Sequence, residues 1–429
     1  MKLALHVILT FFSLLWCFLP AYLQADDVRS GGTPEIPAAL RSSLPEVQPD
    51  RNGLTRYLSE NAPLSPVQLK LCRESLEALR DNKAIDRVDL LGLLARIHQQ
   101  AKKSLVPPLA FTGNEQPGTV SIVLLKLFQA TEILARQALA KGNRPVADSY
   151  LADLQQWSLM LRNAQPNMIQ WVASHYAWRI SINCLLEDWQ NHPDQNRRLA
   201  EIEALVQKQR TTTEELIEAA KGDARWEIQN GGIKGILSEL PPSSGMTIFL
   251  KEPFDQLSTD EVLALPYDAA AQTKRLLSDT LELERCLEKR TALIEWPAFK
   301  DPPNGHKLDH YRTIPNGLGD LFSEQANRSN SMQVWASALS RNPLAEACLA
   351  WLKYERNGTE ITPELFHEFR DPVDGKPLEI DRESRTIRCR GLNMKADQPD
   401  PISPPPPKAG YFSIGDDLLL VVPRWKHTK

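Results

Sequence analysis

The sequence predicts a mainly α-helical fold, in which an irregular helical bundle is followed by a small helix-plus-β-hairpin module of the α+β type. Apolar residues recur at spacings of three and four over much of residues 63–300, the pattern of helices that bury one face. Beyond about residue 369 the pattern changes to short runs that are typical of β-strands. A hydrophobic content of 42% and a charged content of 24% in 429 residues indicate a globular chain of two or three domains.

The charge balance and the absence of several motifs exclude whole classes of function. The chain has 50 Lys and Arg residues against 54 Asp and Glu residues, a formal net charge of −4. A nucleic-acid partner is therefore not expected, because binding phosphates requires a basic excess. The sequence has no G-x-S-x-G elbow, no phosphate-binding glycine loop and no G-x-G-x-x-G motif. We expect no cofactor, and a non-enzymatic protein is favoured.

The first 25 residues carry an export pattern. Met1 and Lys2 precede an apolar run from Leu3 to Leu19, and the small residue Ala25 stands before an acidic start. This predicts that residues 1–25 are a signal peptide and that the mature protein is periplasmic or secreted. The alternative is an uncleaved inner-membrane anchor, because the segment up to Leu23 is long enough to cross a bilayer. Membrane contact is expected only through such an anchor.

The first helices follow a segment without periodicity. Residues 26–62 are rich in Pro, Ser and Gly, and predict an extended lead-in. Ser65 and Pro66 then supply an N-cap and a first-turn proline, so that a helix begins here. A second helix is predicted over about 85–102, with its apolar residues again on one face.

The strongest helical signal lies in residues 120–162. One apolar stripe ends at Lys141-Gly142-Asn143, and Pro145 begins a second stripe. Two helices joined by such a glycine-containing turn form an αα-hairpin. The hairpin resembles a tetratricopeptide-type unit, but no copy recurs at a period of about 34 residues, so that no regular solenoid is predicted.

The remaining elements follow from the same signals. Further helices of the bundle are predicted over residues 166–189, 194–209, 213–229 and 269–294. Proline and glycine make residues 301–341 a loop-rich connector. Asn342 and Pro343 are predicted to begin the helix of the last module, which spans residues 342–429. Short strands follow, and between them residues 401–407 form a proline-rich, extended loop.

Three blocks of the sequence stand out together. They are Leu139-Ala140-Lys141-Gly142, the helix from Asn342 to Gly358, and Arg370-Asp371-Pro372-Val373-Asp374-Gly375-Lys376-Pro377-Leu378. In this order they resemble a widespread group of uncharacterised exported bacterial proteins. Residues 342–422 are also similar in layout to the globular part of the type II secretion major pseudopilin. The pseudopilin cleavage site is absent, so the similarity does not extend to filament assembly. The resemblance implies a helical body, a helix, a turn and a β-hairpin, without an activity.

One segment has the spacing of metal ligands. His306 and His310 are four residues apart, and Asp309 lies between them. Two histidines on one helical face bind a cation when a carboxylate is close. The alternative is a solvated loop, because prolines on both sides leave room for barely two helical turns.

Other candidates have a structural and a functional interpretation. His175 is either a core histidine or a general base. The acidic residues on 213–229 are either a solvated face or acid–base groups; they are Glu214, Glu215, Glu218, Asp223 and Glu227. The aspartates Asp371, Asp374, Asp416 and Asp417 either form turns or, as the resemblance implies, hold calcium. The five cysteines after residue 25 lack close pairs, and an odd number leaves at least one thiol without an intrachain partner.

Two hypotheses for function result. The first is an exported, non-enzymatic helical protein that binds another envelope protein through a groove of its bundle. The second is a metal-dependent hydrolase that uses His306, Asp309 and His310. An apolar groove without convergent titratable groups would favour the first hypothesis.

Overall fold

The structure is a computed structural model of the whole chain. It describes residues 35–424 with gaps at 43, 45–46, 62–63, 82, 112–116, 164–166, 193, 239–253, 255–256, 296–306, 325–327, 392–408 and 415–416. The fold is mainly helical with one small antiparallel sheet near the C-terminus, as the sequence predicts.

Most of the described chain is α-helix. The helices of the first half are α2 (Gly53–Glu60), α3 (Pro66–Arg80), α4 (Val88–Ser104), α5 (Pro117–Ala140), α6 (Arg144–Arg162), α7 (Met168–Trp189) and α8 (Gln195–Lys208). Those of the second half are α9 (Thr213–Gln229), α10 (Gly232–Ser238), α11 (Thr259–Leu263), α12 (Ala269–Glu288), α14 (Leu308–Thr313), α15 (Gly317–Phe322) and α16 (Arg328–Arg356). Single 3-10 turns lie at Ala38–Leu40, Pro49–Arg51, Leu293–Glu295 and Pro363–Phe366.

Side-chain caps explain where several helices begin. Ser65, Thr212 and Ser258 each form a capping box, in which the hydroxyl accepts from a backbone N–H three residues on. The Gly142 turn between α5 and α6 has φ +72°, which glycine adopts without strain. The hairpin predicted over residues 120–162 is therefore present as α5 and α6.

The sheet has four antiparallel strands in the order β1-β2-β4-β3. The strands are β1 (Glu379–Asp381), β2 (Thr386–Cys389), β3 (Gly410–Ile414) and β4 (Asp417–Val421). The register pairs Ile387 of β2 with Leu420 of β4, and both side chains are buried.

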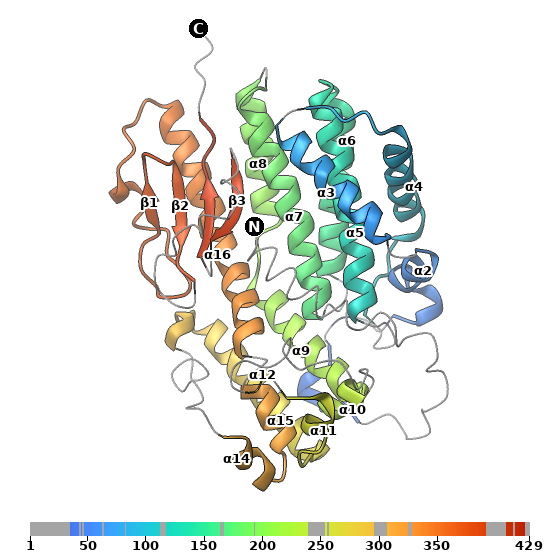
Figure 1. Cartoon of the computed structure of the whole chain (residues 1–429). Coiled ribbons are helices and arrows are strands. Elements are labelled where there is room, and N and C mark those ends of the chain that lie inside the picture. Colours follow the sequence, from blue (N-terminus) through green and yellow to red (C-terminus); the bar gives the residue numbers. More distant parts are fainter. Residues whose placement is uncertain are drawn as a thin grey trace.

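The sheet and the helices share one core. The sheet lies along α16, and its β3 edge meets α7 beside α8, while α2–α6 form the opposite side of the molecule (Figure 1). A single cluster of buried apolar residues runs from α2 through α5–α8 to α16 and the strands. Trp351 of α16 is 1% exposed within it. A smaller cluster joins α10, α11, α14 and α15.

The extended lead-in predicted for residues 26–62 is wrong over its last part, which forms helix α2. Asn52 caps this helix by accepting from Leu54 N, and the same Oδ1 accepts from Ala110 N at 3.1 Å. Leu54 and Tyr57 are fully buried. Because α2 is short, tertiary packing rather than its own periodicity stabilises it.

The connector predicted for residues 301–341 is also more ordered than expected. It contains α14, α15 and the first turns of α16. Pro343 does not begin a helix, because it lies in the interior of α16. A proline there removes one backbone hydrogen bond, and the helix nevertheless continues to Arg356.

Two predicted segments lie outside the described residues: the leader 1–25 and the proline-rich loop 401–407. Among the helices in the described ranges, none has the length and apolarity that crossing a bilayer requires.

We predict that Gly410→Ala destabilises the fold far more than Gly142→Ala. Gly410 has φ +107°, and an added Cβ would lie 2.4 Å from Asn183 Oδ1, which accepts from Tyr411 N at 2.8 Å. Gly142 has φ +72° with nothing within 4 Å of the added Cβ. The expected losses of unfolding free energy are about 3 kcal/mol and about 1 kcal/mol. Urea unfolding measures both, and equal losses would contradict the close approach of β3 to α7.

Candidate functional site

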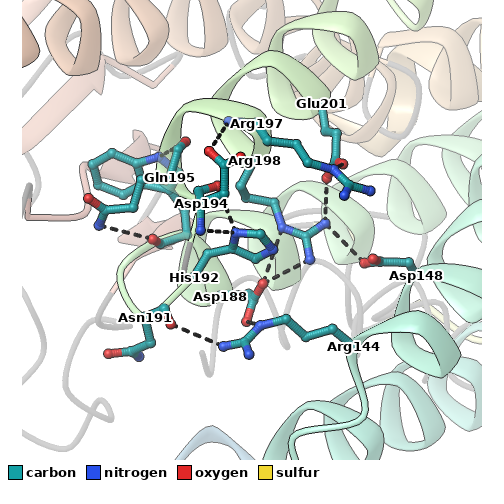
Figure 2. A network of polar contacts seen from close by, with 11 residues as sticks. Arg144, Asp148, Asp188, Asn191, His192, Asp194, Gln195, Arg197, Arg198 and Glu201 are labelled. Carbon is teal, nitrogen blue, oxygen red and sulfur yellow. Dashed lines mark hydrogen bonds and ion pairs between the residues drawn. The ribbon is translucent and has the colours of Figure 1, made fainter.

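The N-terminal end of helix α8 is anchored by a buried arginine. The Arg198 guanidinium lies 2.8 Å from Asp188 Oδ2 of α7 and 3.0 Å from Asp148 Oδ1 of α6, and it also pairs with Glu201 (Figure 2). Burial opposes the charge, but Asp148 and Asp188 raise the pKa of Arg198 above its ordinary value. Arg144 reaches the other oxygen of Asp188 at 3.0 Å. Helices α6, α7 and α8 are therefore tied together at one point.

The C-terminal end of α8 is anchored by two further arginines. Arg162 of α6 donates to the backbone oxygens of Gln209 at 2.8 Å and Arg210 at 2.7 Å. Arg341 of α16 donates to the same Gln209 oxygen. The last carbonyls of a helix lack partners within the helix and carry partial negative charge, which cationic donors satisfy. Next to this contact, Asn342 of α16 exchanges two hydrogen bonds with the Thr211 backbone.

A groove lies between α8 and α16. It has a volume of about 470 Å³, within the size range of ligand pockets. Its lining residues are Glu203, Val206, Gln207, Arg210, Glu346, Leu349, Ala350, Lys353 and Tyr354. Each helix presents positions spaced by three, four and seven residues, so one face of α8 looks onto one face of α16.

The rim of the groove is charged and its floor is apolar. Lys353 Nζ lies 2.6 Å from Glu203 Oε1, and Arg210 lies 3.4 Å from Glu346 Oε1. Because Glu203 faces Lys353 while the later Arg210 faces the earlier Glu346, α8 and α16 run antiparallel. Between the two ion pairs, Val206, Leu349 and Ala350 form the floor. The arrangement can bind an apolar side chain, but it contains no histidine or cysteine and no unpaired carboxylate for catalysis.

A buried hydroxyl–imidazole–carboxylate line lies elsewhere in the helical body. His98 of α4 has Nε2 2.9 Å from Asp153 Oδ2 and Nδ1 3.1 Å from Thr131 Oγ1. Burial lowers the pKa of His98, although the Asp153 charge opposes this. Thr131 is 0% exposed, so no substrate can approach its hydroxyl. The line therefore joins α4, α5 and α6 rather than catalysing a reaction.

The acidic face of α9 is not fully solvated. Asp223 and Glu227 are half-buried, and burial raises the pKa of each to about 7. Asp223 Oδ1 accepts from Met168 N at 3.0 Å, and Glu227 Oε1 accepts from Gln272 Nε2 at 2.8 Å. Glu214 keeps the solvated character expected of this face, and a backbone hydrogen bond lowers its pKa. The face is thus solvated at Glu214 and partly buried at Asp223 and Glu227.

The residues predicted to bind a metal do not form a site in the described part of the chain. His306 lies outside the described residues, and α14 begins at Leu308. Asp309 is exposed and pairs with Arg312 at 3.1 Å, and His310 is exposed as well. Across the described ranges, no group of three His, Cys, Asp or Glu side chains is arranged to hold a metal ion.

Asp371 and Asp374 accept hydrogen bonds from backbone N–H groups two residues on, as turn formers do. Asp371 accepts from Val373 N at 2.8 Å and from Arg390 N at 2.6 Å, so both of its oxygens are occupied. Asp374 accepts from Lys376 N at 2.9 Å, and Asp417 accepts from Gly391 N at 2.7 Å. Asp416 lies outside the described residues.

The described cysteines are all free thiols; they are Cys72, Cys184, Cys286, Cys348 and Cys389. Four of them are buried and Cys286 is half-buried. Burial raises the pKa of Cys72 to about 11 and that of Cys184 to about 12, so these thiols are poor nucleophiles.

Reasoning from the sequence missed the groove and the His98 line. Both helices of the groove were expected, but their pairing joins segments that lie far apart in the chain. The charges at 203 and 210 and at 346 and 353 show the i, i+7 spacing of a shared helical face, which is a weak signal without the fold. His98 follows Leu94 by four residues, and this spacing predicts that it lies on the buried face of the helix.

Comparison of the chain with protein-family models, curated proteins and solved structures finds no match. The groove between α8 and α16 and the sequence patterns are therefore the features that bear on function.

We predict that Asp223→Asn stabilises the protein more at pH 8 than at pH 5. The pKa of Asp223 rises from 3.8 to about 7 in the fold, so its ionisation opposes folding as pH rises through that window. Asparagine keeps an oxygen that accepts from Met168 N. We expect a gain of about 1 kcal/mol at pH 8, measured by urea unfolding.

Glu214→Gln on the same helix is the matched control. Its pKa is lowered in the fold, so this substitution should not stabilise at pH 8. A gain for Asp223→Asn that is equal at both pH values would contradict the assignment.

Proposed function

We propose that the chain is an exported, non-enzymatic helical protein that binds another envelope protein through the groove between α8 and α16. The observation that carries the proposal is the groove itself, an apolar floor between two ion-paired rims. The signal-peptide pattern of residues 1–25 supports a partner in the envelope.

The shape and charge of the groove favour an amphipathic helix as the bound segment. Two antiparallel helices that present i, i+3, i+4 and i+7 positions can accept a third helix, which places apolar side chains on the floor. Exposed ion pairs contribute at most about 1 kcal/mol, so the rim pairs can exchange partners with polar groups of the incoming helix at little cost. With two acidic and two basic rim residues, no strong net charge is required of the partner.

The alternative is a metal-dependent hydrolase centred on His306, Asp309 and His310. That alternative rests on the sequence spacing alone. The ion pair of Asp309 with Arg312 weakens it, because the carboxylate already has a cationic partner.

We predict that a photo-crosslinking residue at Gln207 captures a partner in the native envelope and that one at Lys208 does not. Gln207 lines the groove, and Lys208 is an equally exposed neighbour outside the lining. Adducts are detected on a denaturing gel and identified by mass spectrometry. Equal adducts from both positions, or none from Gln207, would contradict the groove as the site.

The captured partner then allows a test of affinity. We predict that Ala350→Glu weakens binding at least tenfold, equivalent to about 1.4 kcal/mol, because it places an unpaired charge on the apolar floor. Val67→Glu is the control, since Val67 is 68% exposed on α3, far along the chain from both groove helices. Titration calorimetry measures both, and equal affinities would exclude the floor from the interface.

A further inference from the structure

A second feature of α16 lies next to the groove. The Arg341 side chain is 4% exposed and contacts His175 Nδ1, the Gln209 backbone oxygen and the face of Trp178, whose ring centre is 3.9 Å away. These contacts hold the start of the groove-forming part of α16 against the end of α8. Arg210, the next residue after Gln209, belongs to the groove rim.

The contact between Arg341 and His175 fixes the protonation of the imidazole. Arginine has only donors, so His175 Nδ1 must be unprotonated and act as the acceptor. The hydrogen of a neutral His175 is therefore on Nε2, which has no hydrogen-bond partner among the described residues. A proton added to His175 would have to occupy Nδ1 and would remove the acceptor of Arg341.

The charges around His175 also oppose a further proton. Arg341 of α16 and Arg162 of α6 are the cations that face it. The carboxylate nearby is Glu215 of α9, which lies 2.5 Å from Arg162. From the sheet, Tyr411 directs its hydroxyl to the Arg341 backbone oxygen at 3.3 Å, and on α7 the Trp171 ring lies 3.8 Å from the imidazole centre. An imidazolium would thus be a third positive charge beside the Glu215 carboxylate.

We propose that His175 is a proton-sensitive latch, whose protonation releases Arg341 from the end of α8 and loosens the groove. This inference rests on the proposed function only in treating the groove as the binding site. The latch is a property of the free protein and can be tested without a partner.

The direction of the effect follows from proton linkage. Burial, with the charges of Arg341 and Arg162, lowers the pKa of His175 well below its usual 6.5. The open form therefore binds the proton more tightly than the latched form, so the latch weakens as pH falls below about 6.5. Asp223, Glu227 and Asp371 have raised pKa values, and acid stabilises the fold through them. Global stability would mix these effects, so the test must be local.

Hydrogen exchange of the full chain tests the latch. Peptides that cover residues 203–212 and 341–350 are compared at pH 7.5 and pH 5.5, after correction for intrinsic exchange rates. We expect protection in the wild type to fall about tenfold at pH 5.5. His175→Gln should abolish this difference, because its amide oxygen accepts from Arg341 and does not titrate. His98→Gln, at the other buried histidine, should retain it.

A second measurement does not depend on the variants folding. The carbon-13 resonance of the His175 ring in the wild-type protein should titrate below pH 6.5. A titration at or above 6.5, or an equal pH effect on exchange in wild type and His175→Gln, would overturn the latch. Crosslinking from Gln207 at pH 7.5 separates the two proposals. If no adduct forms but exchange depends on pH as expected, only the binding site is refuted. If the adduct forms but exchange does not depend on pH, only the latch is refuted.

Discussion

The arrangement of this protein depends on how the buried ends of α8 are satisfied. Carbonyl groups at the end of a helix need donors, and the residue that caps the C-terminus of α8 is Gln209, with 0% exposure. The donors come from Arg162 of α6 and Arg341 of α16, so meeting one local requirement brings together helices that are distant in the chain. At its other end, Arg198 joins α8 to α6 and α7. With both ends held, α8 stands beside α16 at a spacing that leaves a groove between them.

The buried arginines illustrate two different energetic situations. Arg198 lies among Asp148, Asp188 and Glu201, so its charge is compensated by carboxylates. Arg341 has a carbonyl, an imidazole and an indole face instead, and burial with the nearby charge of Arg162 lowers its pKa well below the ordinary value. Removing the partner of a buried charge is strongly destabilising, because the remaining charge is then uncompensated. The contacts of Arg198 consequently hold α6, α7 and α8 together, whereas those of Arg341 respond to changes in the charge of its neighbours.

Much of the fold could be predicted from the sequence, since apolar periodicity and capping residues are local signals. The helices that became α3–α9 and α12, the capping boxes at Thr212 and Ser258, and the strand content near the C-terminus all follow from such signals. Helix α2 and the position of Pro343 inside α16 could not be predicted from the sequence, because contacts distant in the chain override the local preference there. The groove could not be predicted for the same reason, because its two walls are joined only by tertiary packing. The metal site expected at His306, Asp309 and His310 came from spacing, which carries no information on what surrounds the side chains.

Helix α16 serves the sheet and the groove at once. The helix lies against β2 and β4 of the sheet (Figure 1). Its residues Leu349 and Ala350 line the groove beside α8. A helix moves as a stiff unit, so a displacement of one face of α16 also displaces its other face. A partner bound between α8 and α16 would therefore also stabilise the strands that pack on α16. Conversely, a substitution that destabilises these strands would distort the groove.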